Sequence, residues 1–116
     1  MTPNYIIGID LGGTNLRVAL LGTKYSIKDK QIFNTENFKC KDDLLEGIVY
    51  AIRKIIADNN LQKKNILGVG LGLPGPVDAQ KGIVHFFPNI PGWKEVNIKQ
   101  ILEKKKIGRA SCRERV

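Results

Sequence analysis

Cysteine, histidine and tryptophan are scarce in this chain of 116 residues, which has two Cys, one His and one Trp. Cys40 and Cys112 alone provide neither a disulfide framework nor a Cys-x-x-Cys metal motif. This usage predicts a reducing, cytoplasmic setting. We expect the lone His85 to be an ordinary strand or loop residue and Trp93 to pack against the protein rather than bind a ligand.

Long hydrophobic runs are absent as well. Met1–Asn4 leads directly into the first apolar run without a basic and apolar leader segment. No apolar stretch approaches the roughly 20 residues that cross a bilayer. We therefore expect neither secretion nor membrane insertion.

Positive charge is plentiful but not concentrated. The net charge is +8, of which the last ten residues contribute two. The short runs Lys63–Lys64 and Lys104–Lys106 are typical of solvated helix ends and loops. Because no basic patch carries interleaved aromatic residues, a nucleic-acid partner is not expected. A hydrophobic fraction of 42% is typical of one soluble globular domain.

The most informative segment is residues 10–17, Asp-Leu-Gly-Gly-Thr-Asn-Leu-Arg, which lies between the apolar runs 5–9 and 16–21. This arrangement predicts a tight β-hairpin with a phosphate-sized pocket at its tip. Gly12 and Gly13 permit positive φ and carry no Cβ atoms, so the backbone N–H groups of the turn can approach an anion.

Polar side chains surround the same turn. Thr14 adds a hydroxyl, Asn15 an amide and Arg17 a cation, while Asp10 at the strand end could hold a hydrated Mg²⁺ beside the phosphates. The alternative is a plain hairpin in which the glycines serve only the turn. The glycines alone favour that alternative, whereas the whole set of groups favours phosphate binding.

The remaining pattern predicts an α/β domain. A third strand is expected over Ile27–Glu36, and apolar residues recurring every three or four positions from Leu44 to Ile56 predict an amphipathic helix that covers a sheet face. Asp43 with Glu46 three residues later resembles a capping box. The acidic and amide residues at positions 58–60 end the pattern.

Ile66–Leu73 is apolar on both alternating faces, which predicts a buried strand parallel to the first. The chain is then expected to form a loop, a short outer strand over Gly82–Phe87, and a last helix that begins near Asn97 or Ile98. The prediction is a mixed sheet with strand-strand-strand-helix-strand order.

Two familiar nucleotide motifs can be rejected. Gly70, Gly72 and Gly75 match the letters of the dinucleotide fingerprint, but Pro76 and a polar loop follow where that site requires a helix. A Walker motif is also absent, since Thr14 stands at the position of its phosphate-binding lysine.

The last ten residues, 107–116, have no apolar periodicity and follow the preceding helical pattern without a turn signal. Their sequence resembles the translation of a common sequencing-library adapter. We therefore expect residues 1–106 to be part of the natural domain and residues 107–116 to be a non-native tail. An ordinary basic C-terminal tail is the alternative.

Three segments in order resemble the signatures of the ROK family of sugar kinases. They are Ile9–Arg17, Gly70–Asp78 and Asn89–Trp93. The resemblance extends from about Tyr5 to Lys106, which is less than half of a full-length family member. It implies the N-terminal part of the actin-like ATPase fold with its ribonuclease-H-like core, with ATP, Mg²⁺ and a hexose as ligands.

The resemblance also implies roles for single residues. Asp10 would assist Mg²⁺ and phosphate placement, and Gly12, Gly13 and Thr14 would cradle the ATP phosphates. The residues expected at the sugar are Pro74, Gly75 and Asn89. The alternative is a loop that merely ends a strand for the first two, and a turn residue before a proline for Asn89.

The segment that would carry the catalytic aspartate of a ROK kinase is expected beyond Lys106, as are the zinc motif and the adenosine-binding glycines. The 116 residues should therefore be inactive and poorly soluble, with an open sheet edge and exposed apolar helix surface. Three hypotheses remain. The first is the N-terminal part of a glucokinase-like enzyme of carbohydrate phosphorylation, whose parent is expected to be a homo-oligomer. The others are a sugar-binding ROK repressor, which needs a DNA-binding region ahead of the first strand, and a fragment with no role of its own.

Overall fold

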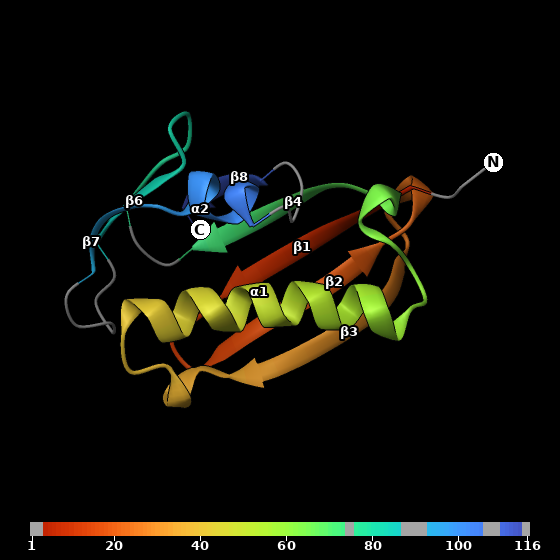
Figure 1. Cartoon of the computed structure of the whole chain (residues 1–116), viewed down its shortest axis with the longest axis horizontal. Coiled ribbons are helices and arrows are strands. Elements are labelled where there is room, and N and C mark those ends of the chain that lie inside the picture. Colours follow the sequence, from red (N-terminus) through yellow and green to blue (C-terminus); the bar gives the residue numbers. More distant parts are fainter. Residues whose placement is uncertain (1–3, 74–75, 87–92, 106–109, 115–116) are drawn as a thin grey trace.

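The computed structural model describes residues 4–73, 76–86, 93–105 and 110–114. Its main feature is a five-stranded sheet with the order β3-β2-β1-β4-β8 (Figure 1). The first three strands are antiparallel neighbours, whereas β4 and β8 continue the sheet in parallel to β1. The expected mixed α/β sheet is thus confirmed. The strands are β1 (Tyr5–Leu11), β2 (Asn15–Leu21), β3 (Ile27–Asn34), β4 (Ile66–Leu73) and β8 (Ala110–Glu114).

Helix α1 (Lys41–Asp58) connects β3 to β4 and covers one face of this sheet. It begins earlier than the capping-box pattern indicates. Cys40 is its N-cap residue and makes no side-chain cap, while Asp43 lies inside the helix and accepts a hydrogen bond from the Lys39 N–H at 3.2 Å. The predicted capping box of Asp43 and Glu46 is therefore wrong. Asn60, with φ of 56°, follows the helix end as expected.

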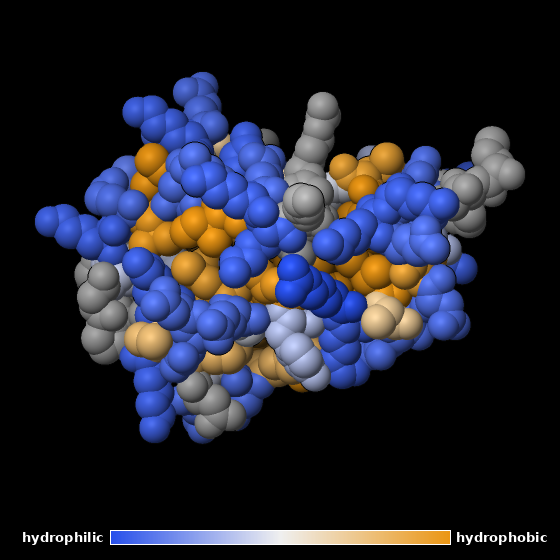
Figure 2. Space-filling view, viewed as in Figure 1, coloured by the Kyte–Doolittle hydropathy of each residue, from blue (hydrophilic) through white to orange (hydrophobic). Residues whose placement is uncertain are grey.

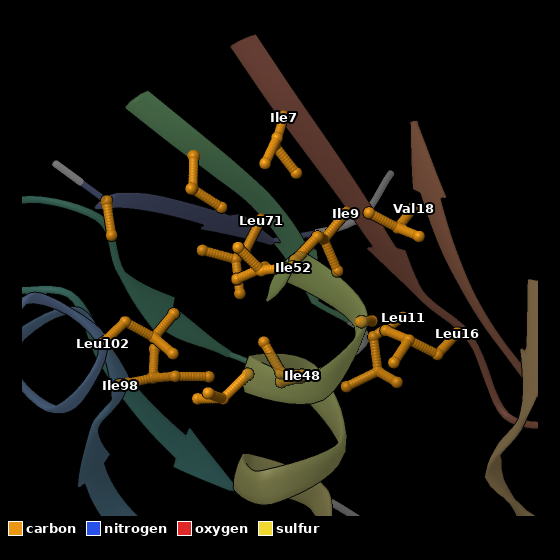
Figure 3. Packing of buried hydrophobic residues seen from close by; sticks show 14 of the residues in the cluster. Ile7, Ile9, Leu11, Leu16, Val18, Ile48, Ile52, Leu71, Ile98 and Leu102 are labelled. Carbon is orange, nitrogen blue, oxygen red and sulfur yellow. The ribbon is translucent and has the colours of Figure 1, made fainter. Parts of the chain in front are cut away.

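Alternation along the strands builds the core beneath α1. Ile7, Ile9 and Leu11 of β1 are buried on the helix side, as are the corresponding alternate residues of β2 and β4. Figure 3 shows these side chains meeting Ile48 and Ile52 of α1. Every apolar residue at the helical spacing from Leu44 to Ile56 is buried. The apolar helix surface that we expected to be exposed is thus covered by the sheet.

A smaller antiparallel sheet follows β4 and has the order β5-β6-β7. The predicted short strand is found as β6 (Ile83–Phe86), flanked by β5 (Val77–Asp78) and β7 (Lys94–Asn97). His85 is a strand residue within 2.9 Å of the Glu95 carboxylate. Trp93 packs in the core and donates its ring N–H to the Val84 carbonyl at 3.3 Å.

Helix α2 (Ile98–Lys104) begins where the sequence indicates. Asn97 is its N-cap and accepts a hydrogen bond from the Gln100 N–H at 3.0 Å. Parallel crossover connections are right-handed. The connection from β3 through α1 to β4 and the connection from β4 through α2 to β8 advance in the same direction across the sheet, so α1 and α2 lie on the same side of it. Ile98 and Leu102 accordingly join the cluster below α1 (Figure 3).

Strand β8 is a feature that the sequence did not predict. Residues 110–114 pair in parallel with Val69–Leu73, and Ala110 and Cys112 are buried toward the core. Strand β8 therefore extends the sheet beyond β4 and is itself an edge strand among the described residues. Two small residues at alternate positions gave too weak a signal, because strand patterns are read mainly from larger β-branched and aromatic side chains.

The face of the sheet opposite α1 is covered by no helix among the described residues. Figure 2 shows the side of the molecule that carries α1, where hydrophilic residues are interspersed with hydrophobic patches. Short 3₁₀ turns, η1 (Thr23–Tyr25), η2 (Thr35–Asn37) and η3 (Lys63–Asn65), complete the described fold. Neither described helix is both long and apolar enough to cross a membrane.

Candidate phosphate-binding site

The hairpin between β1 and β2 forms as predicted, with Asp10 paired to Arg17 and Leu11 to Leu16. A three-residue turn, 12–14, joins the strands, and it is closed by a hydrogen bond from the Gly12 N–H to the Asn15 carbonyl at 2.9 Å. Neither Gly12 nor Gly13 has positive φ, which differs from the freedom we assigned to them. The contribution that remains for Gly12 and Gly13 is that they carry no side chain that would keep an anion away from the backbone of the turn.

The backbone of the turn divides into groups that hold it and groups that face outward. Thr35, at the start of η2, donates its N–H to the Thr14 carbonyl at 2.9 Å and its hydroxyl to the Gly13 carbonyl at 3.1 Å. The N–H groups of Gly13 and Thr14 have no partner among the described residues, and both residues are exposed. The donors available to an anion are therefore those of Gly13 and Thr14, since the Gly12 N–H is used inside the hairpin.

A single small cavity gathers all the residues predicted to bind phosphate. Its volume is about 90 Å³, which corresponds to roughly three water molecules. Sites that enclose a drug-sized ligand are about 300–1,000 Å³. The cavity can thus hold one phosphate-sized group. Its lining residues are Asp10, Gly12, Gly13, Thr14, Asn15 and Arg17.

Asp10 and Arg17 supply opposite charges at the cavity. Their closest nitrogen and oxygen atoms are 3.9 Å apart, and 39% and 56% of the respective side chains are exposed. Such a long, exposed pair contributes little to stability, so Arg17 can turn toward an anion at small cost.

Asp10 also lies beside β4. A Cβ atom built on Gly72 would be 3.8 Å from a carboxylate oxygen of Asp10. The described residues contain no group of three or more potential metal-binding side chains. One carboxylate next to a phosphate cradle nevertheless fits Mg²⁺, which proteins commonly bind through one or two carboxylates together with substrate phosphates and water.

The residues expected at the sugar, Pro74, Gly75 and Asn89, lie outside the described residues. The strand that leads to the first two is in place, because β4 ends at Leu73 and Gly72 is paired with Asp10. The carboxyl ends of the parallel strands β1 and β4 thus meet at the edge where open α/β sheets place ligands.

Thr35 is the residue that sequence reasoning missed. Its two hydrogen bonds to the turn span more than 20 residues of sequence. No local pattern could have shown this contact, because it depends on how β3 returns beside β2. The only available signal was a hydroxyl residue near the end of the predicted third strand, Ile27–Glu36.

Fold and hairpin together define a mixed α/β domain with a glycine-rich polar turn at the carboxyl edge of its parallel strands. The sequence pattern of the ROK family matches residues 6–109, which is most of the chain. The chain belongs to the ROK family.

Relatives of two kinds match the chain. A glucokinase from Halalkalibacterium halodurans is 30% identical over 90% of this chain, and a xylose repressor from Caldicellulosiruptor bescii is 30% identical over 86% of it. A ROK family glucokinase from Streptomyces griseus, solved with glucose and AMPPNP, superposes with a TM-score of 0.79 over 96% of this chain at 22% identity, which shows the shared fold. This chain spans 31%, 25% and 33% of those proteins, respectively.

Proposed function

We propose that this chain is the N-terminal part of an ATP-dependent hexose kinase of the glucokinase type. The observation that carries the proposal is the 90 Å³ cavity, in which the six hairpin residues predicted to bind phosphate and Mg²⁺ converge. A glucokinase among the relatives and another among the structural neighbours support the choice of activity. The parent protein would transfer the γ-phosphoryl group of ATP to a sugar hydroxyl.

Four residues of the hairpin act on the nucleotide or its metal ion in this proposal. The N–H groups of Gly13 and Thr14 donate to phosphate oxygens, and the Thr14 hydroxyl and Arg17 guanidinium add further donors. Asp10 would hold hydrated Mg²⁺ beside the phosphates, and the ion would supply charge neutralisation there. Thr35 keeps the turn in register by holding the two carbonyls on its other side.

The proposal places the other half of the chemistry beyond residue 106. Phosphoryl transfer depends on holding two substrates in line inside a closed cleft, and the described cavity is one wall of such a cleft. We propose that residues 1–106 belong to the kinase domain and that residues 107–116 derive from an adapter sequence. The 116-residue chain should therefore produce no ADP from ATP and glucose.

The experiment is a coupled assay of ADP formation with the complete protein, encoded by the genomic reading frame that continues past Lys106. Glucose-dependent ADP formation is expected, and Asp10→Asn should lower kcat on the order of 100-fold. Glu36→Gln, an exposed carboxylate in η2, is the matched control and should leave kcat unchanged. A folded complete protein that binds ATP but phosphorylates no hexose would refute the kinase.

A second candidate is a ROK regulator that binds sugar without phosphorylating it. The xylose repressor, which matches over nearly the same share of this chain as the glucokinase, favours it. The two candidates differ in the complete gene. A repressor would carry a DNA-binding region ahead of β1 and would bind an operator fragment in a sugar-dependent way, without consuming ATP.

A further inference from the structure

A second cavity, of about 550 Å³, lies between β3 and the first half of α1, apart from the phosphate cavity. The two cavities share no lining residue. Three aromatic side chains and two carboxylates line this second cavity, which we name the aromatic pocket. Its lining residues are Phe33, Asn34, Phe38, Asp43, Glu46, Gly47 and Tyr50.

One wall of the aromatic pocket is a stripe along α1. Asp43, Glu46, Gly47 and Tyr50 are spaced i, i+3, i+4 and i+7, so they lie on one side of the helix. This stripe borders the buried apolar face of the helix, and Glu46 and Tyr50 are exposed. The helix thus presents two carboxylates and a phenol ring to the cavity.

The facing wall comes from the end of β3 and the segment after it. The ring of Phe33 meets the ring of Tyr50 edge to face, with centroids 6.0 Å apart and planes at 79°. The outer end of the Phe38 ring lies against α1 at Gly47, where any Cβ atom would overlap it. Glycine at position 47 is therefore what allows a third aromatic ring to close the pocket.

Charge in the aromatic pocket is opposite to that of the chain as a whole. The protein carries a net charge of +8, yet the two charged side chains that line this cavity are both carboxylates. Neither Asp43 nor Glu46 forms an ion pair with a described residue, and the hydrogen bond that Asp43 accepts comes from the backbone N–H of Lys39. By contrast, Asp58 at the other end of α1 pairs with Lys54 and Gln31.

We propose that the aromatic pocket binds a guanidinium group, presented as an arginine side chain by a partner protein. Aromatic rings attract a cation over their faces, and a carboxylate within reach adds a charge-assisted hydrogen bond. A flat guanidinium suits this pocket better than a lysine ammonium, since it stacks on a ring and donates to two carboxylates at once. The proposal is independent of kinase activity, because no residue of the phosphate cavity takes part.

The test measures the binding of three capped amino acids to the 116-residue chain, at micromolar protein concentration, by saturation-transfer NMR. N-acetyl-arginine methylamide should bind in the millimolar range and lose affinity as salt is added, because salt screens exposed charges. N-acetyl-citrulline methylamide, which has nearly the same shape without the charge, should not bind detectably. N-acetyl-lysine methylamide should bind about threefold more weakly than the arginine compound.

Variants locate the binding to this pocket. Tyr50→Leu and Glu46→Gln should each weaken arginine binding about threefold, whereas Tyr50→Phe, which keeps the ring, should retain it. Asp42→Asn removes a carboxylate from the same helix end but not from the pocket lining, and serves as the matched control. Far-ultraviolet circular dichroism verifies that each variant is folded. Equal binding of citrulline, or arginine binding that ignores both Tyr50→Leu and Glu46→Gln, would overturn the proposal.

Discussion

At the scale of single residues, the turn of the β1–β2 hairpin depends on what is missing at position 13. Gly13 is exposed, lines the 90 Å³ cavity, and has no side chain to obstruct its own N–H. Gly13→Val in the complete protein should lower the affinity for MgATP at least about tenfold, which corresponds to ~1.4 kcal/mol. Titration calorimetry measures it.

Gly8→Ala is the control for Gly13→Val. Gly8 lies on β1, outside the phosphate cavity, and a Cβ atom there would meet only the Leu21 side chain at 3.9 Å. This variant should bind MgATP like the wild type. If a folded Gly13→Val protein binds MgATP with unchanged affinity, the turn is not part of the nucleotide site.

Thr35 gives a second prediction at this scale. Thr35→Val keeps the shape of the side chain but removes the hydroxyl that holds the Gly13 carbonyl at 3.1 Å. We expect the free energy of unfolding to fall by about 1 kcal/mol. MgATP affinity should fall by about threefold, because the turn is less firmly positioned. Urea unfolding and calorimetry measure the two effects, and Thr35→Ser should restore both if the hydroxyl is responsible.

These residues show why the site was predictable in part. Asp10, Gly13, Thr14 and Arg17 lie within one short hairpin, where sequence neighbours are necessarily neighbours in space. Thr35 reaches the turn only through the return of β3, which a local pattern cannot reveal. Likewise, the use of the Gly12 N–H inside the hairpin follows from the actual turn geometry rather than from residue type.

At the scale of elements, α1 supplies most of the helical part of the core. Ile52 is fully buried in the core cluster that also contains Ile9 of β1 and Leu71 of β4 (Figure 3). Ile52→Ala should lower the free energy of unfolding by about 2–5 kcal/mol, through lost transfer free energy and the cavity left behind. Arg53→Ala, at the exposed neighbouring position, should change it by less than about 0.5 kcal/mol. Urea unfolding of both variants decides whether α1 packs as described.

Strand β8 can be tested through its thiol. Cys112 is 1% exposed, and burial raises its pKa to about 11, whereas Cys40 is exposed. At pH 8 an aromatic disulfide reagent should modify Cys40 quickly and Cys112 only in denaturant. The variant Cys40→Ser retains only the buried thiol of Cys112 and is therefore the direct control. Rapid labelling of Cys112 in the folded chain would contradict the packing of β8.

The same thiol predicts a pH effect. The unfolded chain ionises Cys112 near pH 9, whereas the folded chain holds its proton to about pH 11. Because the folded pKa is raised, this contribution to stability is fully present below pH 9 and is lost as the pH rises toward 11. Cys112→Ala should therefore show a smaller loss of stability than the wild type between pH 9 and 11, as measured by urea unfolding.

Sequence patterns predicted the elements where the signal was strong and repeated. The alternation of β1 and β2 and the helical spacing from Leu44 to Ile56 each offered several large apolar residues in phase. The start of α1 was predicted too far along the chain. Only two residues, Asp43 and Glu46, indicated the capping box, and the helix-compatible residues just before them extend the helix to Lys41. In β8 the inward residues, Ala110 and Cys112, are too small to create a visible pattern.

At the scale of the whole molecule, the sheet is asymmetric. α1 and α2 lie on one side, and the other side presents a hollow of about 600 Å³ on β1, β2 and β3. Ile32 borders this hollow and is 64% exposed, and Leu67 on β4 is 58% exposed. Exposed apolar surface of this kind favours association. Poor solubility stays a prediction, and we now base it on this sheet face rather than on an exposed helix surface.

The 116-residue chain should thus self-associate through the face opposite α1, and sedimentation velocity over a range of concentrations measures this. Ile32→Thr combined with Leu67→Thr should raise the dissociation constant at least about tenfold, since burying one such side chain contributes about 1.5 kcal/mol or more. Tyr25→Thr removes a hydrophobic residue that is 77% exposed but lies in η1, outside this face, so it should leave association unchanged. If Tyr25→Thr acts as strongly as the double variant, association is driven by exposed apolar area in general, and the asymmetry of the sheet does not direct it.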